Sequence, residues 1–418
     1  MRTQFKWTAI LALFLGMAFS GSFAQDQEVR VGVASWMLEK MPMEEAATRF
    51  EENHPGVDIV LESLASEFDT SIIPALGAEN PPYDLLMPYP GGDAAPFAEL
   101  DLLAPWNNVF DNPDLQVNGH ELSRSDFVEG FIQQADYDGQ TISLPVFGEI
   151  MALTVRKDLL NDAGISDVPA TWSEVADACV KLANPFMAGF SSEVSRGRNT
   201  ITALFGIAMA NGGSILNEEG RFNLLAPETV EAMNYLVGLN TEQECAQSNA
   251  VDQWDASRTA FLGGHVATFY NWASWGMQAV LPEPIFGEDA ISTSAAPGAS
   301  ENGTVLYTGG AIIPKNGNVE LAQQFVVEMI ESLWFQQWSA TRYGKSPVLT
   351  ENYEGLSDSQ WGHLVPMTTN GESMPSFLNF TEMTNIFQKH FNRAWNGEIT
   401  PEAALAATEE EIAPLYQN

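Results

Sequence analysis

The residues of this chain that could do chemistry are carboxylates and aromatic rings rather than nucleophiles or metal ligands. Its five histidines are scattered, without the paired spacing of a zinc site such as HExxH, and its two cysteines do not form a CxxC pair. The chain has no GxSxG turn for a serine nucleophile and no glycine-rich phosphate loop after a strand. We therefore expect a binding protein rather than an enzyme, with no catalytic residue, no metal and no cofactor.

One carboxylate stands out by its position, Glu149, within the segment LPVFGEIMALTVRKDLL at residues 144–160. An apolar run, Ile150–Val155, follows directly after a proline and a glycine, a pattern that is typical of a break before a buried strand. Glu149 is therefore expected at the tight turn by which the chain enters this strand, with its side chain directed at a ligand. The alternative is that it forms an ion pair with Arg156 or Lys157.

Tryptophan supplies the second group of candidates. Of the 11 tryptophans, three follow apolar runs or lie beside glycine and asparagine: Trp36, Trp272 and Trp275. An indole ring can stack on the apolar face of a sugar ring, while carboxylates, amides and arginines bind its hydroxyls. Each ring could instead fill the core. We interpret three others as packing residues: Trp172, Trp334 and Trp361.

An α/β pattern must position these side chains, because short apolar strands alternate with amphipathic helices. In the N-terminal part we expect strands at 29–34, 57–61 and 83–88, and helices at 43–54 and 68–78. Further on we expect strands at 150–155, 266–270 and 306–314, and helices at 158–163, 200–210, 227–239, 319–331 and 401–415. Thr171, followed three positions later by Glu174, has the spacing of a helix capping box.

The N-terminus has the composition of an export signal. Arg2 and Lys6 precede a short apolar run at 10–19, and Ser22–Ala24 is a small-x-small cleavage site, so residues 1–24 are predicted to be a signal peptide cleaved near Ala24. No segment is long and apolar enough to predict a membrane span. We expect export to the periplasm and no stable membrane insertion.

The charge balance restricts the partners. The chain has 55 acidic and 18 basic residues, a formal net charge of −37, and such a field repels nucleic acid and anionic membranes. The acidic residues are spread along the chain, so no acidic tail is predicted. Their number is interpreted as an adaptation to a salty medium, or as a means of recruiting a cationic ligand.

Cys179 and Cys245 are expected to form a disulfide, because disulfides persist in exported proteins. A bridge over so long a loop contributes roughly 3–4 kcal/mol of stability in the chain-entropy description. The alternative is two free buried thiols.

The chain resembles the extracellular solute-binding proteins of ATP-driven importers, family 1, the group that includes maltose-binding protein. The resemblance covers essentially the whole mature chain. It rests on LPVFGEIMALTVRKDLLNDAGI, PATWSEVADACVKL, AFLGGHVATFYNWASW, GGAIIPKNGNVELAQQFV and GEITPEAALAATEEEI.

The resemblance implies a two-lobed α/β fold, the type II periplasmic binding protein fold, in which sheets are flanked by helices and the ligand cleft lies between the lobes. Carried over to this chain, lobe 1 would comprise residues 25–145 and 297–330. Lobe 2 would comprise residues 146–296 and 331–418. Closure would occur by bending at the hinge.

The resemblance also implies a set of ligand-binding residues: Trp36, Glu67, Phe68, Tyr83, Asp84, Glu149, Asn271, Trp272, Trp275, Gly309, Gly310, Arg342 and Tyr343. Departures from the family pattern are Tyr83, where a proline is usual before Asp84, and Asn271, where a glycine is usual before Trp272. For Asp84 the alternative is that it binds loop amides, and for Arg342 that it lies on the surface.

The function that this implies is delivery of a neutral sugar or polyol to the membrane permease of an importer, by a monomeric binding protein. A polyamine or another cationic solute is the alternative ligand, with Asp84 and Glu149 beside aromatic rings as its site. A secreted glycan-active enzyme is the third hypothesis. If Glu149 binds the ligand, Glu149→Ala is expected to weaken binding while leaving the melting midpoint of the free protein nearly unchanged.

Overall fold

The computed structural model describes residues 27–64, 72–117, 119–194, 197–247, 255–287, 289–298, 303–356, 364, 367–368 and 371–417. The predicted signal peptide, Glu67, Phe68 and Trp361 lie outside these residues. Within them, no helix is both long and apolar enough to cross a membrane.

The N-terminal part builds a parallel sheet with helices on it. Strand β1 (Gln27–Ala34) pairs in parallel with β2 (Val57–Leu64) and with β3 (Leu85–Pro90). Between β1 and β2 lie α1 (Ser35–Lys40) and α2 (Met43–Asn53), and α2 buries the apolar face formed by Met43, Ala46, Ala47 and Phe50. Helices α3 (Ile73–Leu76) and α4 (Gly91–Glu99) flank β3. The expected strands and the first helix are confirmed.

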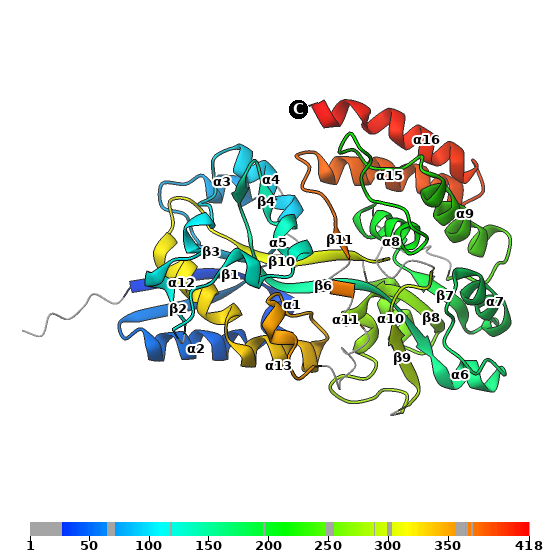
Figure 1. Ribbon diagram of the computed structural model, residues 1–418, viewed down its shortest axis with the longest axis horizontal. Helices are drawn as coiled ribbons and strands as arrows, with labels where there is room; N and C mark the ends of the chain where they lie inside the picture. Colours follow the sequence, from blue (N-terminus) through cyan, green and yellow to red (C-terminus); the bar gives the residue numbers. More distant parts are fainter. Residues whose placement is uncertain are drawn as a thin grey trace, which may run out of the picture.

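Two long strands join this part to the rest of the molecule. Strand β6 (Leu144–Arg156) and strand β10 (Val305–Ile312) run antiparallel, with Tyr307 opposite Glu149. Strand β10 continues the first sheet through β3, while the second half of β6 pairs with β8 (Val266–Trp272) and β9 (Ile291–Ser294). The strand order is β2-β1-β3-β10-β6-β8-β7, so one sheet path runs through both halves of the molecule (Figure 1).

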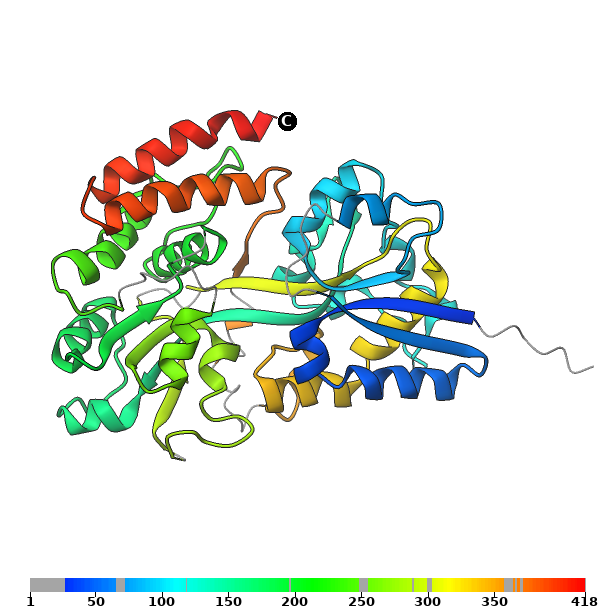
Figure 2. The same cartoon turned by 180° about the vertical axis from the view of Figure 1, so that it is seen from behind.

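The second half packs helices around β8 and β7 (Ala188–Ser192), which are parallel to each other. Its helices are α6 (Lys157–Asp162), α7 (Trp172–Leu182), α8 (Gly197–Ala210), α9 (Pro227–Thr241), α10 (Ala256–Leu262), α11 (Ala273–Met277), α15 (Phe380–Trp395) and α16 (Pro401–Ile412). Seen from behind, α15 and α16 lie on the same side as α8 and α9 (Figure 2). The remaining elements are α5 (Glu129–Gln134), β4 (Asp136–Tyr137), β5 (Gln140–Thr141), α12 (Val319–Ile330), α13 (Leu333–Tyr343) and β11 (Glu372–Ser373).

The buried apolar side chains form separate clusters on the two sides of the joining strands, which gives the molecule two lobes. One large cluster gathers residues of β1–β3, α2 and α12, and the other gathers residues of β7, β8, α7–α9 and α15. A smaller third cluster lies under α4. Two clusters are the physical reason for two lobes, because a chain of this length exceeds what one core usually serves.

Helix α13 packs differently from the division expected from the sequence. Residues 331–418 were expected in lobe 2, yet Phe335 and Ala340 of α13, and Val348 after it, are buried in the cluster of the first lobe. Helix α13 follows α12 after a short turn, and its apolar face therefore reaches the same core. Figure 1 shows it beside α12, below β1 and β6.

The prediction of a tight turn just before Ile150 is wrong. Strand β6 begins at Leu144 and continues through Gly148 and Glu149, so Glu149 lies within a strand. The glycine is needed for packing rather than for a turn, because a Cβ at Gly148 would overlap the ring of Phe131 on α5.

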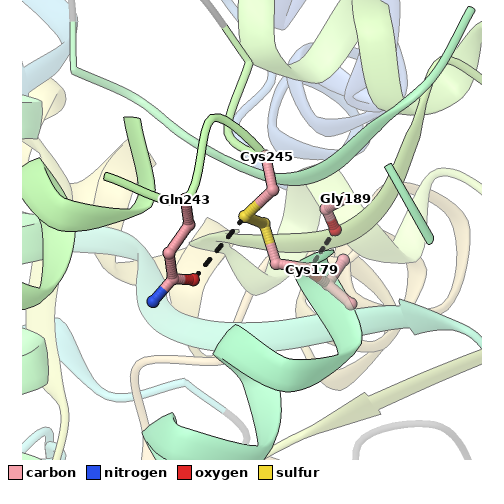
Figure 3. The surroundings of a disulfide bond; sticks show 5 residues. Cys179, Gly189, Gln243 and Cys245 are labelled. Carbon is pink, nitrogen blue, oxygen red and sulfur yellow. Dashed lines mark hydrogen bonds between the residues drawn. A yellow bond between two sulfur atoms is a disulfide. The ribbon is translucent and has the colours of Figure 1, made fainter. Parts of the chain in front are cut away.

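Two local predictions in the second lobe are confirmed. Helix α7 begins with the expected capping box, in which the Thr171 hydroxyl accepts from the amide of Glu174, 3.2 Å away, and the Glu174 carboxylate accepts from the amide of Thr171. Cys179 and Cys245 form a disulfide with a Cα–Cα distance of 5.6 Å, which ties α7 to the segment after α9 (Figure 3).

Candidate functional site

The candidate site lies where strand ends from both lobes meet the joining strands. Side chains from α1, β6, β8, β10 and the end of α13 come together there. We call this group the crossing site: Trp36, Phe147, Glu149, Trp272, Tyr307, Tyr343 and Lys345. Phe147 and Glu149 alternate along β6 and so point to the same face, and their cross-strand partners Gly309 and Tyr307 share that face.

Glu149 is the buried charge of the crossing site, with 6% of its surface exposed. Its Oε1 atom forms an ion pair with the ammonium group of Lys345 and accepts a hydrogen bond from the hydroxyl of Ser274 at 3.0 Å. Its Oε2 atom is buried and has no hydrogen-bond partner within the described part of the chain. A buried carboxylate oxygen without a donor is costly, so this atom is a position for a hydroxyl of a ligand.

The alternative partners that the sequence offered for Glu149 do not bind it. The guanidinium of Arg156 pairs instead with Asp158 at 2.6 Å. Lys157 begins α6, after the end of β6. Along a strand, successive side chains point to opposite faces and rise about 3.3 Å per residue, so neither residue can reach back to Glu149.

Sequence reasoning missed three residues of the crossing site: Phe147, Tyr307 and, above all, Lys345. Lys345 is 4% exposed, and its ammonium nitrogen lies 4.7 Å from the ring centroid of Phe147, 4.9 Å from Trp36 and 5.3 Å from Tyr343. The turn at Gly344, with φ 74°, ends α13 and brings the lysine inward. The glycine was the available signal, but a lysine just after a helix end is usually exposed.

Trp36 and Tyr343 form one wall of the site. Their rings stack with centroids 5.9 Å apart and an interplanar angle of 23°, and Trp36 meets Phe147 edge-on at 5.6 Å. Burial raises the pKa of the Tyr343 hydroxyl to about 12, with a smaller lowering by the positive charge of Arg258. Both rings are half-buried, so this wall keeps an edge toward solvent.

Tyr307 and Trp272 form the second wall, and a charged pair lies beside them. The Trp272 ring lies 5.6 Å from Tyr307, and burial raises the pKa of the Tyr307 hydroxyl. That hydroxyl accepts a hydrogen bond from Arg198 of α8 at 2.9 Å, and Arg198 also forms an ion pair with Asp93 of α4. The Asp93–Arg198 pair thus connects the two lobes.

Comparison with known proteins identifies the family. The family model described as bacterial extracellular solute-binding protein matches residues 37–332, more than half of the chain. The chain belongs to this family. Members of the family are binding proteins, so the chain is a solute-binding protein and not an enzyme, and the hypothesis of a glycan-active enzyme is wrong.

Among the curated relatives, a binding protein of Brucella abortus is 27% identical over 239 residues, 54% of this chain and 53% of its own length. The chain therefore spans about half the length of this relative. A protein of Deinococcus radiodurans described as an ABC transporter-binding protein is 23% identical over 303 residues, 68% of this chain and 71% of its own length.

Solved structures have the same fold. A maltose-bound MalE3 of T. maritima superimposes with a TM-score of 0.78 over 93% of this chain and 99% of its own, at 19% identity. A solute-binding protein of Agrobacterium radiobacter in complex with ribitol gives 0.75 over 94% and 100%, at 18% identity. The two-lobed periplasmic binding protein fold expected from the sequence is therefore confirmed.

Two of the expected ligand residues of this solute-binding protein lie away from the crossing site. Asp84 precedes β3, at the amino end of the strand, and its two carboxylate oxygens accept from the amides of Arg30 at 2.9 Å and Asn318 at 2.8 Å. The structure therefore agrees with the loop-amide alternative. Tyr83 beside it interacts with Glu62 on β2. Burial and, to a smaller extent, the Glu62 carboxylate raise the pKa of the Tyr83 hydroxyl.

Asn271 on β8 and Trp275 on α11 belong to lobe 2. The Asn271 amide donates to Ser257 at 3.2 Å and its oxygen accepts from the backbone amide of Trp272 at 2.8 Å. Ser257 in turn donates to the buried carboxylate of Glu193 at 3.1 Å. The Trp275 ring lies under the Arg258 guanidinium at 5.8 Å. Asn271 therefore orients the end of β8 and positions Trp272.

The glycines of β10 have a packing role. A Cβ at Gly309 would overlap the ring of Phe147, and one at Gly310 would overlap the hydroxyl of Ser143. The close approach that they permit is therefore to the protein itself. Arg342 is exposed on α13, as its surface alternative predicted. Within the described part of the chain, no group of three or more acidic, histidine or cysteine side chains could hold a metal ion.

Proposed function

We propose that this solute-binding protein binds a neutral, polyhydroxylated ligand, a sugar or polyol, at the crossing site. The observation that carries the proposal is the state of Glu149. Its charge is balanced internally by Lys345, while its second oxygen has no donor within the described residues. Such an oxygen suits a hydroxyl group, and a charge-assisted hydrogen bond of this kind is among the stronger polar contacts.

The aromatic walls support the same ligand class. Trp36, Trp272 and Tyr307 bring ring faces and edges from both lobes to the same place, and such rings stack on the apolar faces of sugars. Proteins with the same fold were solved with maltose, alpha-D-tagatose, ribitol and D-mannitol, all of them neutral and rich in hydroxyls.

A polyamine fits less well. A cationic ligand needs an uncompensated acid beside the rings, and the two acids proposed for this role are both engaged. Asp84 accepts hydrogen bonds from two backbone amides at the amino end of β3, and Glu149 is paired with Lys345. The aromatic rings that would surround a cation already surround the lysine.

The proposed mechanism is closure of the two lobes around the ligand, with bending in β6 and β10. We divide the lobes as expected from the sequence, except that residues 333–349 pack with lobe 1. A ligand that contacts both lobes selects the closed form. We further propose that the chain is exported to the periplasm with cleavage near Ala24, acts as a monomer and delivers its ligand to the permease of an ABC importer.

A thermal-shift panel tests the proposal. The purified protein would be melted with monosaccharides, oligosaccharides, polyols and polyamines, since a ligand that binds only the folded state raises the melting midpoint. We expect at least one sugar or polyol to raise the midpoint and spermidine to leave it unchanged. A rise with spermidine alone would overturn the proposal.

A further inference from the structure

Lys345 fills an aromatic cage that is built like a binding site for an organic cation. Three rings, those of Trp36, Phe147 and Tyr343, surround its ammonium nitrogen at 4.7–5.3 Å from their centroids. A carboxylate, Glu149, closes the cage at the bottom. Rings at this distance and an acid are the features by which proteins bind quaternary ammonium groups.

The three rings come from separate parts of the fold. Trp36 follows β1, Phe147 lies on β6 and Tyr343 ends α13. Their mutual contacts, Trp36 with Phe147 and Trp36 with Tyr343, hold the cage together without the lysine. We therefore expect the cage to persist when the lysine side chain is shortened.

We propose that Lys345 is a specificity-determining residue, a built-in cation that closes the cage and thereby makes the site reject cationic solutes. The inference deepens the proposed function and rests on it, since it explains how an acidic, aromatic site takes a neutral ligand. Two effects act together: the ammonium occupies the space, and its charge cancels that of Glu149. In a net acidic protein, such compensation removes the attraction of the site for cations.

The proposal predicts that removing the lysine side chain turns the cage into a cation site. In Lys345→Ala the cage is vacated and Glu149 loses its counter-ion, so a small cation gains both ring contacts and a carboxylate. Tetramethylammonium is the probe, because it is compact and cannot donate hydrogen bonds. Its affinity is measured by calorimetry and by thermal shift, against sodium chloride at the same ionic strength.

We expect tetramethylammonium to bind Lys345→Ala at least tenfold more tightly than wild type and to raise its melting midpoint. Wild type should show no difference between the two salts. The matched control is Lys315→Ala, which removes a lysine from an exposed pair with Asp101 and should behave as wild type. A third variant, Trp36→Ala in the Lys345→Ala background, should lose most of the gained affinity.

The inference is overturned if folded Lys345→Ala responds equally to both salts, or if wild type binds tetramethylammonium equally well. Should the unpaired Glu149 prevent folding, the double variant Glu149→Gln/Lys345→Ala removes both charges of the cage and takes over the test. Its rings must then give a specific response to tetramethylammonium, and the absence of one contradicts the proposal. Sugar binding by wild type tests the proposed function separately, so the two failures are distinguishable.

Discussion

Asp84 and Glu149 are both nearly buried carboxylates, and both were predicted to bind ligand, yet the structure uses them in opposite ways. Asp84, 8% exposed, lies at the amino end of β3 and joins three segments of lobe 1 through backbone amides. Glu149 lies on the strand that passes between the lobes, with one oxygen compensated and the other buried without a donor in the described chain.

The difference teaches that the role of a buried carboxylate is indicated better by whether both of its oxygens have hydrogen-bond donors than by its exposed fraction. A carboxylate whose two oxygens both accept hydrogen bonds in the free protein stabilises the fold, whereas a buried carboxylate oxygen without a donor can accept one from a ligand. For Asp84, position in the sheet agrees, because it precedes the amino end of β3 whereas ligands of α/β proteins bind at the carboxyl ends of strands.

The largest effect is expected from Glu149→Ala. It leaves the ammonium of Lys345 buried without its partner, so the free energy of unfolding should fall by about 3–5 kcal/mol. The expectation that its melting midpoint stays unchanged, drawn from the sequence alone, is therefore withdrawn. Ligand affinity should fall roughly tenfold to a hundredfold, because a charged hydrogen bond is lost. Denaturant melts and calorimetry measure both.

The control for this variant is Glu149→Gln/Lys345→Met, which removes both charges and keeps the volume. It should regain most of the lost stability but not the affinity. Full affinity in the double variant would show that Glu149 acts only as the partner of Lys345, and the contrast with Asp84 would disappear.

Asp84→Ala comes next. The amides of Arg30 and Asn318 would each lose their acceptor, so unfolding should become easier by about 1–3 kcal/mol. Ligand affinity, measured by calorimetry on the folded variant at low temperature, should change less than twofold. A loss of affinity comparable to that of the Glu149 variant would place Asp84 back in the ligand site.

Arg198→Gln tests a contact between the lobes rather than within one. Its pair with Asp93 is partly exposed and contributes about 0.5–1 kcal/mol to the arrangement in which the lobes meet, so ligand affinity should fall roughly twofold to fivefold. The matched control is Arg124→Gln, which breaks a pair with Asp136 inside lobe 1 and should leave affinity unchanged. Equal effects of both variants would contradict a role for Asp93–Arg198 in closure.

The smallest effect concerns a third acid, Glu331, whose burial is not fully compensated. Burial raises its pKa to about 7, although His120, at 3.3 Å, lowers it in part. The hydrogen bond with Glu331 in turn raises the pKa of His120. Both folded pKa values lie above the ordinary ones, so their contribution to stability is present at low pH and is lost as pH rises.

The window for Glu331 runs from its ordinary pKa, 4.5, to about 7. We expect the melting midpoint to fall across this window and the fall to be shallower in Glu331→Gln. Thermal melts at stepped pH and constant ionic strength measure this. An identical pH profile in wild type and variant would show that Glu331 does not titrate there.

Much of the fold was predictable from local signals. The alternation of β1, β2 and β3 with their helices, the capping box at Thr171 and the bond between Cys179 and Cys245 follow from periodicity, spacing and compartment. The site was predictable only in part. Trp36, Glu149, Trp272 and Tyr343 do come together. Residue type and position indicated the first three, whereas Tyr343 came only from the resemblance to a family.

The remaining residues depend on distant contacts that a sequence does not display. Phe147 and Tyr307 reach the site because of the register between β6 and β10, and Lys345 because Gly344 turns the chain inward after α13. A buried lysine contradicts its ordinary preference for solvent and becomes visible only with its partner in place. For Asp84, the amides of Arg30 and Asn318 that bind its carboxylate come from segments distant in the sequence, so this role too became visible only in the structure.

A crystal structure of the protein with the sugar or polyol that gives the largest thermal shift tests the central claim most directly. The measurement is the distance from Oε2 of Glu149 to the nearest ligand oxygen. We predict a hydroxyl oxygen at about 2.5–3.0 Å, with Lys345 still paired to Oε1. A ligand bound elsewhere, or one that leaves Oε2 without a donor, would contradict it.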